Sequence, residues 1–179
     1  MIDLTVAYIV SQIITVIFYG LFAYSYLLKT QRSILVVGAI AVILNAVAFI
    51  LLGGWSGVAM CAIALARNLV CYRFKSFGSS RWFLLIVFGA IIIATIPTFD
   101  SFWSLMSVFA TCVYSYSVWQ KKPIVYKLCG LPVGVLWIIY NIYILSVFGV
   151  ILEIALTIFA LVGFIKDFKS LNSREAPTK

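Results

Sequence analysis

The sequence predicts an all-α membrane protein with seven transmembrane helices, arranged as a parallel 3+1+3 repeat. Hydrophobic residues make up 65% of the 179-residue chain and charged residues only 10%, whereas an average soluble domain is about 45–50% apolar and about 25% charged. Seven apolar runs follow one another, and basic residues gather in alternate connections between them. This composition excludes an ordinary soluble enzyme, a disordered chain and a secreted disulfide scaffold.

The apolar runs define the expected helices in chain order. Each run approaches the roughly 20 residues that a membrane-spanning helix needs, and in lipid each must satisfy its backbone polar groups internally as a helix. We expect one membrane domain over residues 1–170, followed by a cytoplasmic tail at 171–179. The runs cover residues 4–28, 34–52, 55–72, 82–97, 102–119, 125–145 and 148–165.

The basic residues predict the orientation of these helices. The second, fourth and sixth connections hold no Lys or Arg, and their single charge is Asp100. Because Lys and Arg favour cytoplasmic loops, we expect the N-terminus outside and the C-terminus in the cytoplasm. The net charge of +8 then anchors one face and attracts anionic lipid headgroups, so nucleic-acid binding is not expected. The other connections and the tail hold Lys29, Arg32, Arg73, Lys75, Arg81, Lys121, Lys122, Lys127, Lys166, Lys169, Arg174 and Lys179.

A weak internal repeat groups the helices. Two tripeptides recur in the second half of the chain, each in a similar place relative to a basic segment. The first repeat then covers 4–75, the second covers 102–168, and 82–97 is a linker helix that restores the direction of the chain, as in SWEET-type transporters. The recurring tripeptides are Tyr24-Ser25-Tyr26 with Tyr114-Ser115-Tyr116, and Phe74-Lys75-Ser76 with Phe168-Lys169-Ser170.

Two charged side chains lie inside the expected spans, where charge is costly and commonly functional. Arg67 lies about 18 Å past the start of its helix at Trp55. It either extends along the helix toward the interface or faces the interior, where it holds a polar ligand group or a neighbouring helix. Glu153 lies near the outer end of the last span. It is either an interfacial carboxylate or a ligand contact and protonatable group.

Amides and aromatic residues complete the candidate ligand-binding set. Trp137, Tyr140 and Asn141 share one face of a helix, and an indole beside an amide suits a flat ligand with a polar rim. Core packing and hydrogen bonds between helices are the competing interpretations. The full set is Arg67, Asn68, Asn45, Trp137, Tyr140, Asn141, Glu153 and Gln12.

Catalytic and metal-binding patterns are missing from the sequence. The chain has no histidine, the commonest general base and metal ligand. None of the cysteines forms a CxxC pair, and they are expected to pack as small hydrophobic residues. We therefore expect no enzyme activity, no metal and no cofactor. The cysteines are Cys61, Cys71, Cys112 and Cys129.

Short motifs over residues 8–168 resemble the YgjV-type family of bacterial inner-membrane proteins. This resemblance implies a multi-pass protein of the bacterial cytoplasmic membrane, distantly similar to the SWEET, PQ-loop and PnuC-type transporter group. Ala48 departs from the pattern, since family members often carry histidine there. The motifs are Ser11-Gln12, Phe49-Ile50-Leu51-Leu52-Gly53, Gly57, Arg67-Asn68, Trp137-Ile138-Ile139-Tyr140-Asn141, Gly149 and Glu153.

These observations favour a small-solute transporter or facilitator that works by alternating access between two three-helix bundles. The alternative is a membrane scaffold or sensor that transports nothing. The expected partners are the lipid bilayer and a small polar solute. The sequence leaves open the identity of the solute, a coupling ion and the oligomeric state, which includes a homo-oligomer.

Overall fold

The computed structural model describes residues 4–25, 31–74, 80–120 and 123–175, and these form seven α-helices. The all-helical prediction is therefore confirmed for this part of the chain, with one helix for each apolar run. A short 3-10 turn, η2 (Phe102–Ser104), precedes the fifth helix. The helices are α1 (Leu4–Ser25), α2 (Gln31–Leu51), α3 (Trp55–Arg73), α4 (Arg81–Thr98), α5 (Leu105–Gln120), α6 (Pro123–Tyr143) and α7 (Val147–Glu175).

Several helix boundaries differ from those expected from the sequence. The fifth helix begins at Leu105 because residues 102–104 form the 3-10 turn. The last helix continues to Glu175, so part of the expected tail is helical. The sixth ends at Tyr143 because the next residues form a tight turn. Among the residues named above, Tyr26, Lys29, Lys75, Ser76, Lys121, Lys122 and Lys179 lie outside the described residues.

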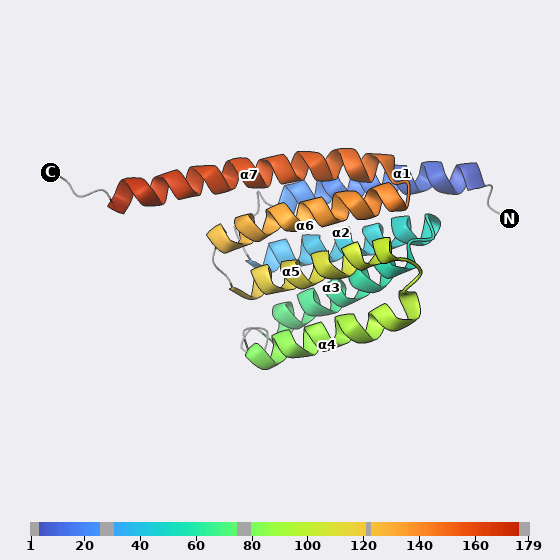
Figure 1. Cartoon of the computed structure of the whole chain (residues 1–179), viewed down its shortest axis with the longest axis horizontal. Coiled ribbons are helices and arrows are strands. Elements are labelled where there is room, and N and C mark those ends of the chain that lie inside the picture. The colour runs from blue at the N-terminus through green and yellow to red at the C-terminus, as the bar shows by residue number, and fades with distance from the viewer. Residues whose placement is uncertain (1–3, 26–30, 75–79, 121–122, 176–179) are drawn as a thin grey trace.

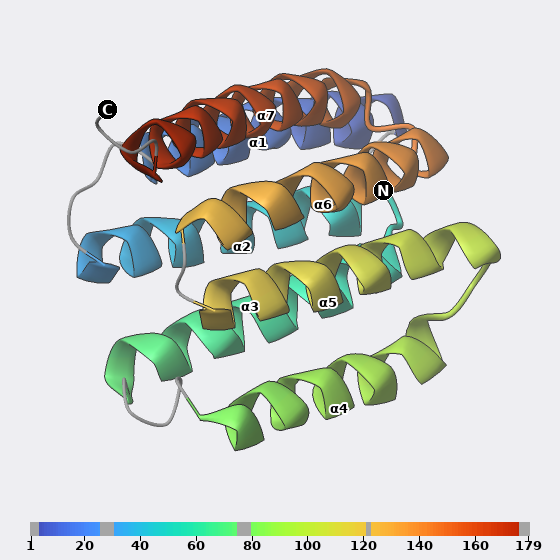
Figure 2. The same ribbon diagram turned by 60° about the vertical axis from the view of Figure 1, so that its left-hand side comes forward.

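The helices form two layers that face each other. In Figure 2, α1, α2 and α3 form one layer and α7, α6 and α5 form the other. The edges of the layers meet, because α1 packs against α7 and α3 packs against α5. Helix α4 packs on α3 and α5 at one edge of the molecule (Figures 1 and 2).

Consecutive helices run in opposite directions, which gives the bundle two distinct ends (Figure 1). We call one the turn end, because the α2–α3 and α6–α7 turns lie there. We call the other the basic end, because α3 finishes at Arg73 and α4 starts at Arg81 there. Helices α1, α3, α5 and α7 therefore run from the turn end to the basic end.

Four helices are long and apolar enough to cross a membrane on their own: α1, α3, α4 and α7. Helices α2 and α6 have shorter apolar segments, at Leu35–Leu51 and Leu128–Tyr143. Large apolar side chains cover the outside of the bundle; on α4, Ile93 and Ile96 are 70% and 75% exposed. Such a surface is stable against lipid and would be a large apolar patch in water.

The turns that end α2 and α6 have the same backbone geometry. The N–H of Gly54 donates to the carbonyl of Phe49 at 2.9 Å, and the N–H of Ser146 donates to the carbonyl of Asn141 at 2.9 Å. Each turn contains one residue with positive φ, Gly53 at 71° or Leu145 at 57°. Both are Schellman motifs, in which a left-handed residue ends the helix and glycine is the usual choice.

One glycine in each layer allows the turn to pack closely. A Cβ on Gly57 would lie 2.7 Å from a ring carbon of Phe49 and 2.8 Å from the Tyr140 hydroxyl. A Cβ on Gly149 would lie 2.5 Å from Oδ1 of Asn141. Because Gly57 and Gly149 have no side chain, the helix that follows each turn can approach the helix before it.

Gly57→Ala is expected to destabilise the fold. The added methyl would overlap the rigid Phe49 ring, and overpacking of this kind lowers the free energy of unfolding by about 1–3 kcal/mol. Gly89→Ala in α4 is the matched control, since nothing lies within 4 Å of its Cβ position. Denaturant unfolding of the two purified variants measures the difference. Equal stability would contradict the packing described here.

Candidate functional site

Polar side chains gather in the interior of the bundle, where most are buried between helices. Toward the turn end lies a group that we call the turn-end cluster. An arginine with its partners lies nearer the basic end. The turn-end cluster comprises Gln12 and Tyr19 of α1, Asn45 and Phe49 of α2, Ser56 and Cys61 of α3, Trp137, Tyr140 and Asn141 of α6, and Glu153 of α7.

Tyr140 is fully buried and caps the first turn of α3. Its hydroxyl oxygen accepts the backbone N–H of Gly57 at 2.8 Å and the hydroxyl of Ser56 at 3.0 Å. The first N–H groups of a helix have no partner within that helix. In a non-aqueous interior an unsatisfied N–H is costly, so α6 supplies an acceptor that α3 needs.

Three aromatic rings fill the space between α2 and α6. The ring of Phe49 stacks on Trp137 with centroids 5.8 Å apart and an angle of 12°. Tyr140 meets Phe49 and Trp137 edge-on, at 5.6 and 5.7 Å. These offset and edge-to-face geometries are the favourable ones for aromatic pairs. One face of Trp137 is therefore covered by the facing layer, and core packing accounts for its position in this structure.

Gln12 connects α1 to the start of α7. Its side-chain oxygen accepts the backbone N–H of Phe148 at 3.0 Å, and its amide nitrogen donates to Ser11 at 3.3 Å. Gln12 thus caps α7 in the same sense as Tyr140 caps α3. Asn45 instead links α2 to α3, since its amide nitrogen lies 3.6 Å from Sγ of Cys61.

Glu153 is hydrogen-bonded across the α1–α7 interface. The hydroxyl of Tyr19 donates to Oε2 of Glu153 at 2.5 Å, and Tyr19 is 7% exposed. Asn141 lies beside this pair, with its amide nitrogen donating to the carbonyl of Trp137 at 2.9 Å. The carboxyl group is therefore half-buried and hydrogen-bonded to a neighbouring helix.

Arg67 is also buried, at 4% exposure, and its side chain extends from α3 to α5. Its guanidinium donates to the hydroxyl of Ser115 at 2.9 Å and to Oδ1 of Asn68 at 3.4 Å. The guanidinium carbon also lies 4.9 Å from the ring centroid of Tyr114, a cation–π contact. These contacts hold Arg67 in the interior, so it does not extend to the interface along the lipid-facing surface.

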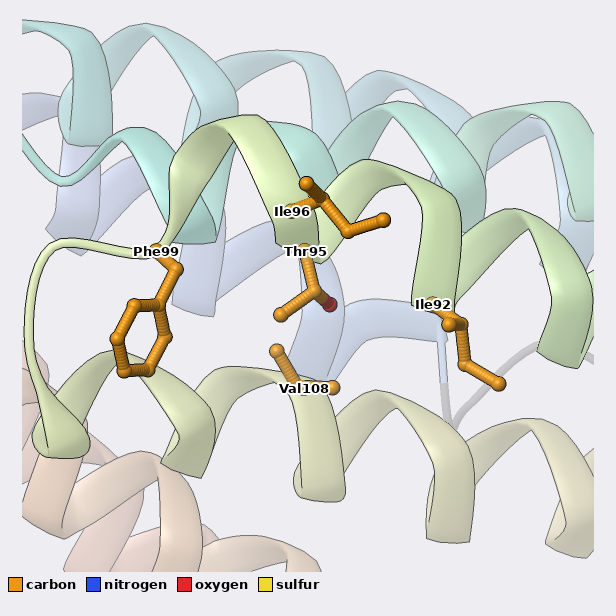
Figure 3. A pocket seen from close by; sticks show the side chains of 5 residues that line it. All are labelled: Ile92, Thr95, Ile96, Phe99 and Val108. Carbon is orange, nitrogen blue, oxygen red and sulfur yellow. The ribbon is translucent and has the colours of Figure 1, made fainter.

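Helix α4 contributes to an apolar hollow of about 400 Å³ on the outside of the bundle. Ile92, Thr95 and Ile96 come from α4, Phe99 follows the last residue of α4, and Val108 comes from α5 (Figure 3). Ile92, Ile96 and Phe99 are each more than half exposed. The hollow therefore belongs to the lipid-facing surface and lies apart from the turn-end cluster. Its lining residues are Ile92, Thr95, Ile96, Phe99 and Val108.

The structure brings six of the eight predicted residues into the turn-end cluster and places Arg67 with Asn68 in a separate group nearer the basic end. Three of the predicted residues have partners that were not predicted from the sequence: Tyr19, Ser56 and Ser115. A signal for Tyr19 was present, because Ser11, Thr15 and Tyr19 recur every fourth residue on one face of α1 and all three are buried.

Metal-binding groups are missing from the part of the chain that the structure describes. It holds no group of three or more His, Cys, Asp or Glu side chains close enough to share an ion. Its four cysteines are free thiols. The chemistry that the interior offers is hydrogen bonding by amides, hydroxyls, one carboxyl and one guanidinium, together with aromatic stacking.

An all-helical bundle with a lipid-compatible surface and a polar interior defines a multi-pass membrane protein. The model of the Imp-YgjV family, described as bacterial inner membrane protein, matches residues 9–170. The chain belongs to this family and lies in the bacterial inner membrane. The comparisons with curated proteins and with solved structures find no match.

Tyr140→Phe is expected to lower the free energy of unfolding by about 1–3 kcal/mol, because the buried N–H of Gly57 loses its acceptor. Tyr143→Phe is the matched control, since the Tyr143 hydroxyl is exposed and lies 3.4 Å from Asp100. It should change stability by less than about 0.5 kcal/mol. Thermal or denaturant unfolding in one detergent compares the two, and equal losses would refute the capping role.

Proposed function

We propose that this protein is a small-solute transporter or facilitator built from two three-helix halves, α1–α3 and α5–α7, joined by α4. The observation that carries the proposal is the matched pair of turns. A shift of 92 positions takes Gly53 to Leu145 and Gly57 to Gly149, with the same hydrogen bonds and the same close approach at each site. A repeated bundle around a shared interior is a common transporter architecture.

The helix contacts support this two-fold relation. A rotation that takes α1 to α5, α2 to α6 and α3 to α7 turns the α1–α7 contact into the α5–α3 contact, and both are present. Paired helices also run in the same direction (Figure 1). This agrees with a parallel 3+1+3 repeat and with a distant relationship to the SWEET, PQ-loop and PnuC-type group, which remains a fold-level analogy.

The polar residues lie where the two halves meet, which supports movement of one half against the other. Tyr140 of the second half bonds to α3 of the first, Tyr19 of the first half bonds to Glu153, and Arg67 of the first half bonds to Ser115. In alternating access these contacts break and re-form as the interior opens to either side. The structure then corresponds to a state in which the turn end is closed.

The solute that this interior suits is a flat ring with polar groups at its edge. Separation of Phe49 from Trp137 would offer an aromatic face on each half for stacking. Asn45, Asn141 and Arg67 would supply hydrogen bonds to its polar edge, with Gln12, Asn68, Tyr140 and Glu153 around them. No enzyme activity is part of this proposal.

A second candidate function is a membrane scaffold or sensor, which a specific observation favours. Gln12 and Tyr140 already bond to backbone N–H groups of other helices, as expected of groups that fix a permanent packing. In that case the protein acts through partner helices, including those of a second copy in a homo-oligomer.

Uptake into reconstituted vesicles tests the transport proposal, with a panel of tritiated nucleosides and nucleobases as the probes. Arg67→Ala should reduce uptake roughly 10- to 100-fold, because a hydrogen bond to a charged group contributes about 1.5–3 kcal/mol. Arg73→Ala is the matched control on the same helix, since Arg73 is exposed and should leave uptake within about twofold.

Reactivity of Cys61 keeps this test informative when no probe is carried. Cys61 is 5% exposed between the halves. In a variant that retains Cys61 as its sole cysteine, alternating access predicts slow labelling by a membrane-impermeant maleimide from at least one side. Absence of both uptake and labelling would reject the transporter in favour of the scaffold.

The proposed orientation places the turn end outside and the basic end in the cytoplasm. A cysteine replacing Asp100, which is exposed on the α4–α5 connection, should react with an impermeant maleimide in intact cells. A cysteine replacing Phe74, which is 57% exposed beyond α3, should react only after permeabilisation. The reverse pattern would overturn the orientation.

A further inference from the structure

We propose that Glu153 and Tyr19 form a proton-binding site on the α1–α7 interface, and that protonation of Glu153 holds this interface closed. The link between this site and solute movement rests on the transport proposed above. The site itself does not, because it follows from the contact between the buried Tyr19 and the half-buried Glu153.

The geometry isolates one carboxyl group in the interior. Of the five acidic residues in the sequence, only Glu153 lies within one of the seven apolar runs. The others are Asp3, Asp100, Asp167 and Glu175. Oε2 of Glu153 accepts the hydroxyl of Tyr19 at 2.5 Å, at the short end of the range for O–H···O hydrogen bonds. In the neutral acid Oε2 is the carbonyl oxygen, which accepts the same bond. At this level α1 contacts α7 through this hydrogen bond and through the packing of Leu152 and Leu156 against the cluster that contains Phe18 and Tyr19.

The groups around this pair provide no neutralising charge among the described residues. Tyr19 is the titratable group from α1, and Cys61 of α3 lies beyond Tyr19. From α6 comes the neutral amide of Asn141. On α7 itself, the Thr157 hydroxyl donates to the backbone carbonyl of Glu153 at 2.8 Å and so does not reach the carboxyl group.

This environment links the protonation state to the packing of the two helices. A half-buried carboxylate without a cationic partner is costly to desolvate, so the packed interface favours the neutral acid, whose carbonyl oxygen still accepts the Tyr19 hydroxyl. When α1 and α7 separate, water reaches the carboxyl and solvates the ionised form. The Glu153 O–H bond then breaks, its proton passes to water, and the electron pair remains on the carboxylate; Tyr19 keeps its own proton.

A second contact at the same interface makes the movement cooperative. Gln12 accepts the N–H of Phe148, one and a half turns before Glu153 on α7. Separation of Tyr19 from Glu153 therefore also exposes the first turn of α7. A proton taken up at Glu153 restores both contacts together. A proton gradient would in this way bias the opening of the α1–α7 interface.

Infrared difference spectroscopy on the reconstituted protein tests the site directly and needs no solute. A step from low to high pH should remove the carbonyl-stretch band of a protonated acid in a hydrophobic environment. Glu153→Gln, which keeps a hydrogen-bond acceptor for Tyr19, should lack this band, and Tyr19→Phe should shift it. An identical band in the wild-type protein and in Glu153→Gln would overturn the proposal.

Spin labels test the mechanical part. Ile13 of α1 and Ile151 of α7 are both 55% exposed and accept labels in a cysteine-free background. We expect the distance between labels to lengthen as pH rises, and to be insensitive to pH in Glu153→Gln. Thr157→Val is the matched control and should respond like the wild type. A distance independent of pH in the wild type would refute the closing role.

These outcomes separate the two proposals. A titrating band with no uptake of any nucleoside probe leaves the proton site in place and rejects only the transporter. Uptake that is abolished by Arg67→Ala, in a protein without the band, leaves the transporter in place and rejects the proton site.

Discussion

The need to satisfy backbone N–H groups away from water is the constraint on which this bundle depends. Helices α3 and α7 start immediately after tight turns, and their first N–H groups have no acceptor within the helix. The acceptors come from the opposite layer: Tyr140 of α6 caps α3, and Gln12 of α1 caps α7. Each layer therefore completes a helix of the other. Gly57 lets the Tyr140 cap approach α3, and Gly149 lets Asn141 and Ser146 approach the start of α7. Close packing and polar satisfaction therefore arise at neighbouring positions.

The two layers contain the same type of turn, after α2 and after α6, but differ in their charged residues. A shift of 92 positions aligns Cys61 of α3 with Glu153 of α7, and Arg67 of α3 with Phe159 of α7. Neither Arg67 nor Glu153 therefore has a charged counterpart in the other layer. Arg67 supports the α3–α5 interface and Glu153 supports the α1–α7 interface. These two interfaces thus involve side chains of opposite charge at different levels of the bundle, so they need not open under the same conditions.

The fold was largely predictable from the sequence, and the pairing of side chains was not. Apolar runs predict helices directly because lipid leaves the backbone few alternatives, and the described helices follow those runs closely. The partners of Glu153 and Arg67 were missed because Tyr19 and Ser115 are common residues in membrane helices and carry no charge. Their importance depends on which helices touch, and a single sequence does not encode the α1–α7 and α3–α5 contacts visibly. Likewise, Leu145 adopts a glycine-like backbone that nothing in its residue type indicates.

The parallel course of α1 and α7 restricts how this chain can be rearranged. The two helices lie side by side and run in the same direction (Figure 1), so the start of α1 and the end of α7 lie at opposite ends of the bundle. Circular permutation, which is simple where termini are neighbours, would here require a linker that crosses the roughly 30 Å hydrocarbon core. Head-to-tail concatenation of two copies meets the same barrier. Engineered tandem forms therefore need one additional membrane-spanning helix between copies, which is the role proposed for α4 within the chain.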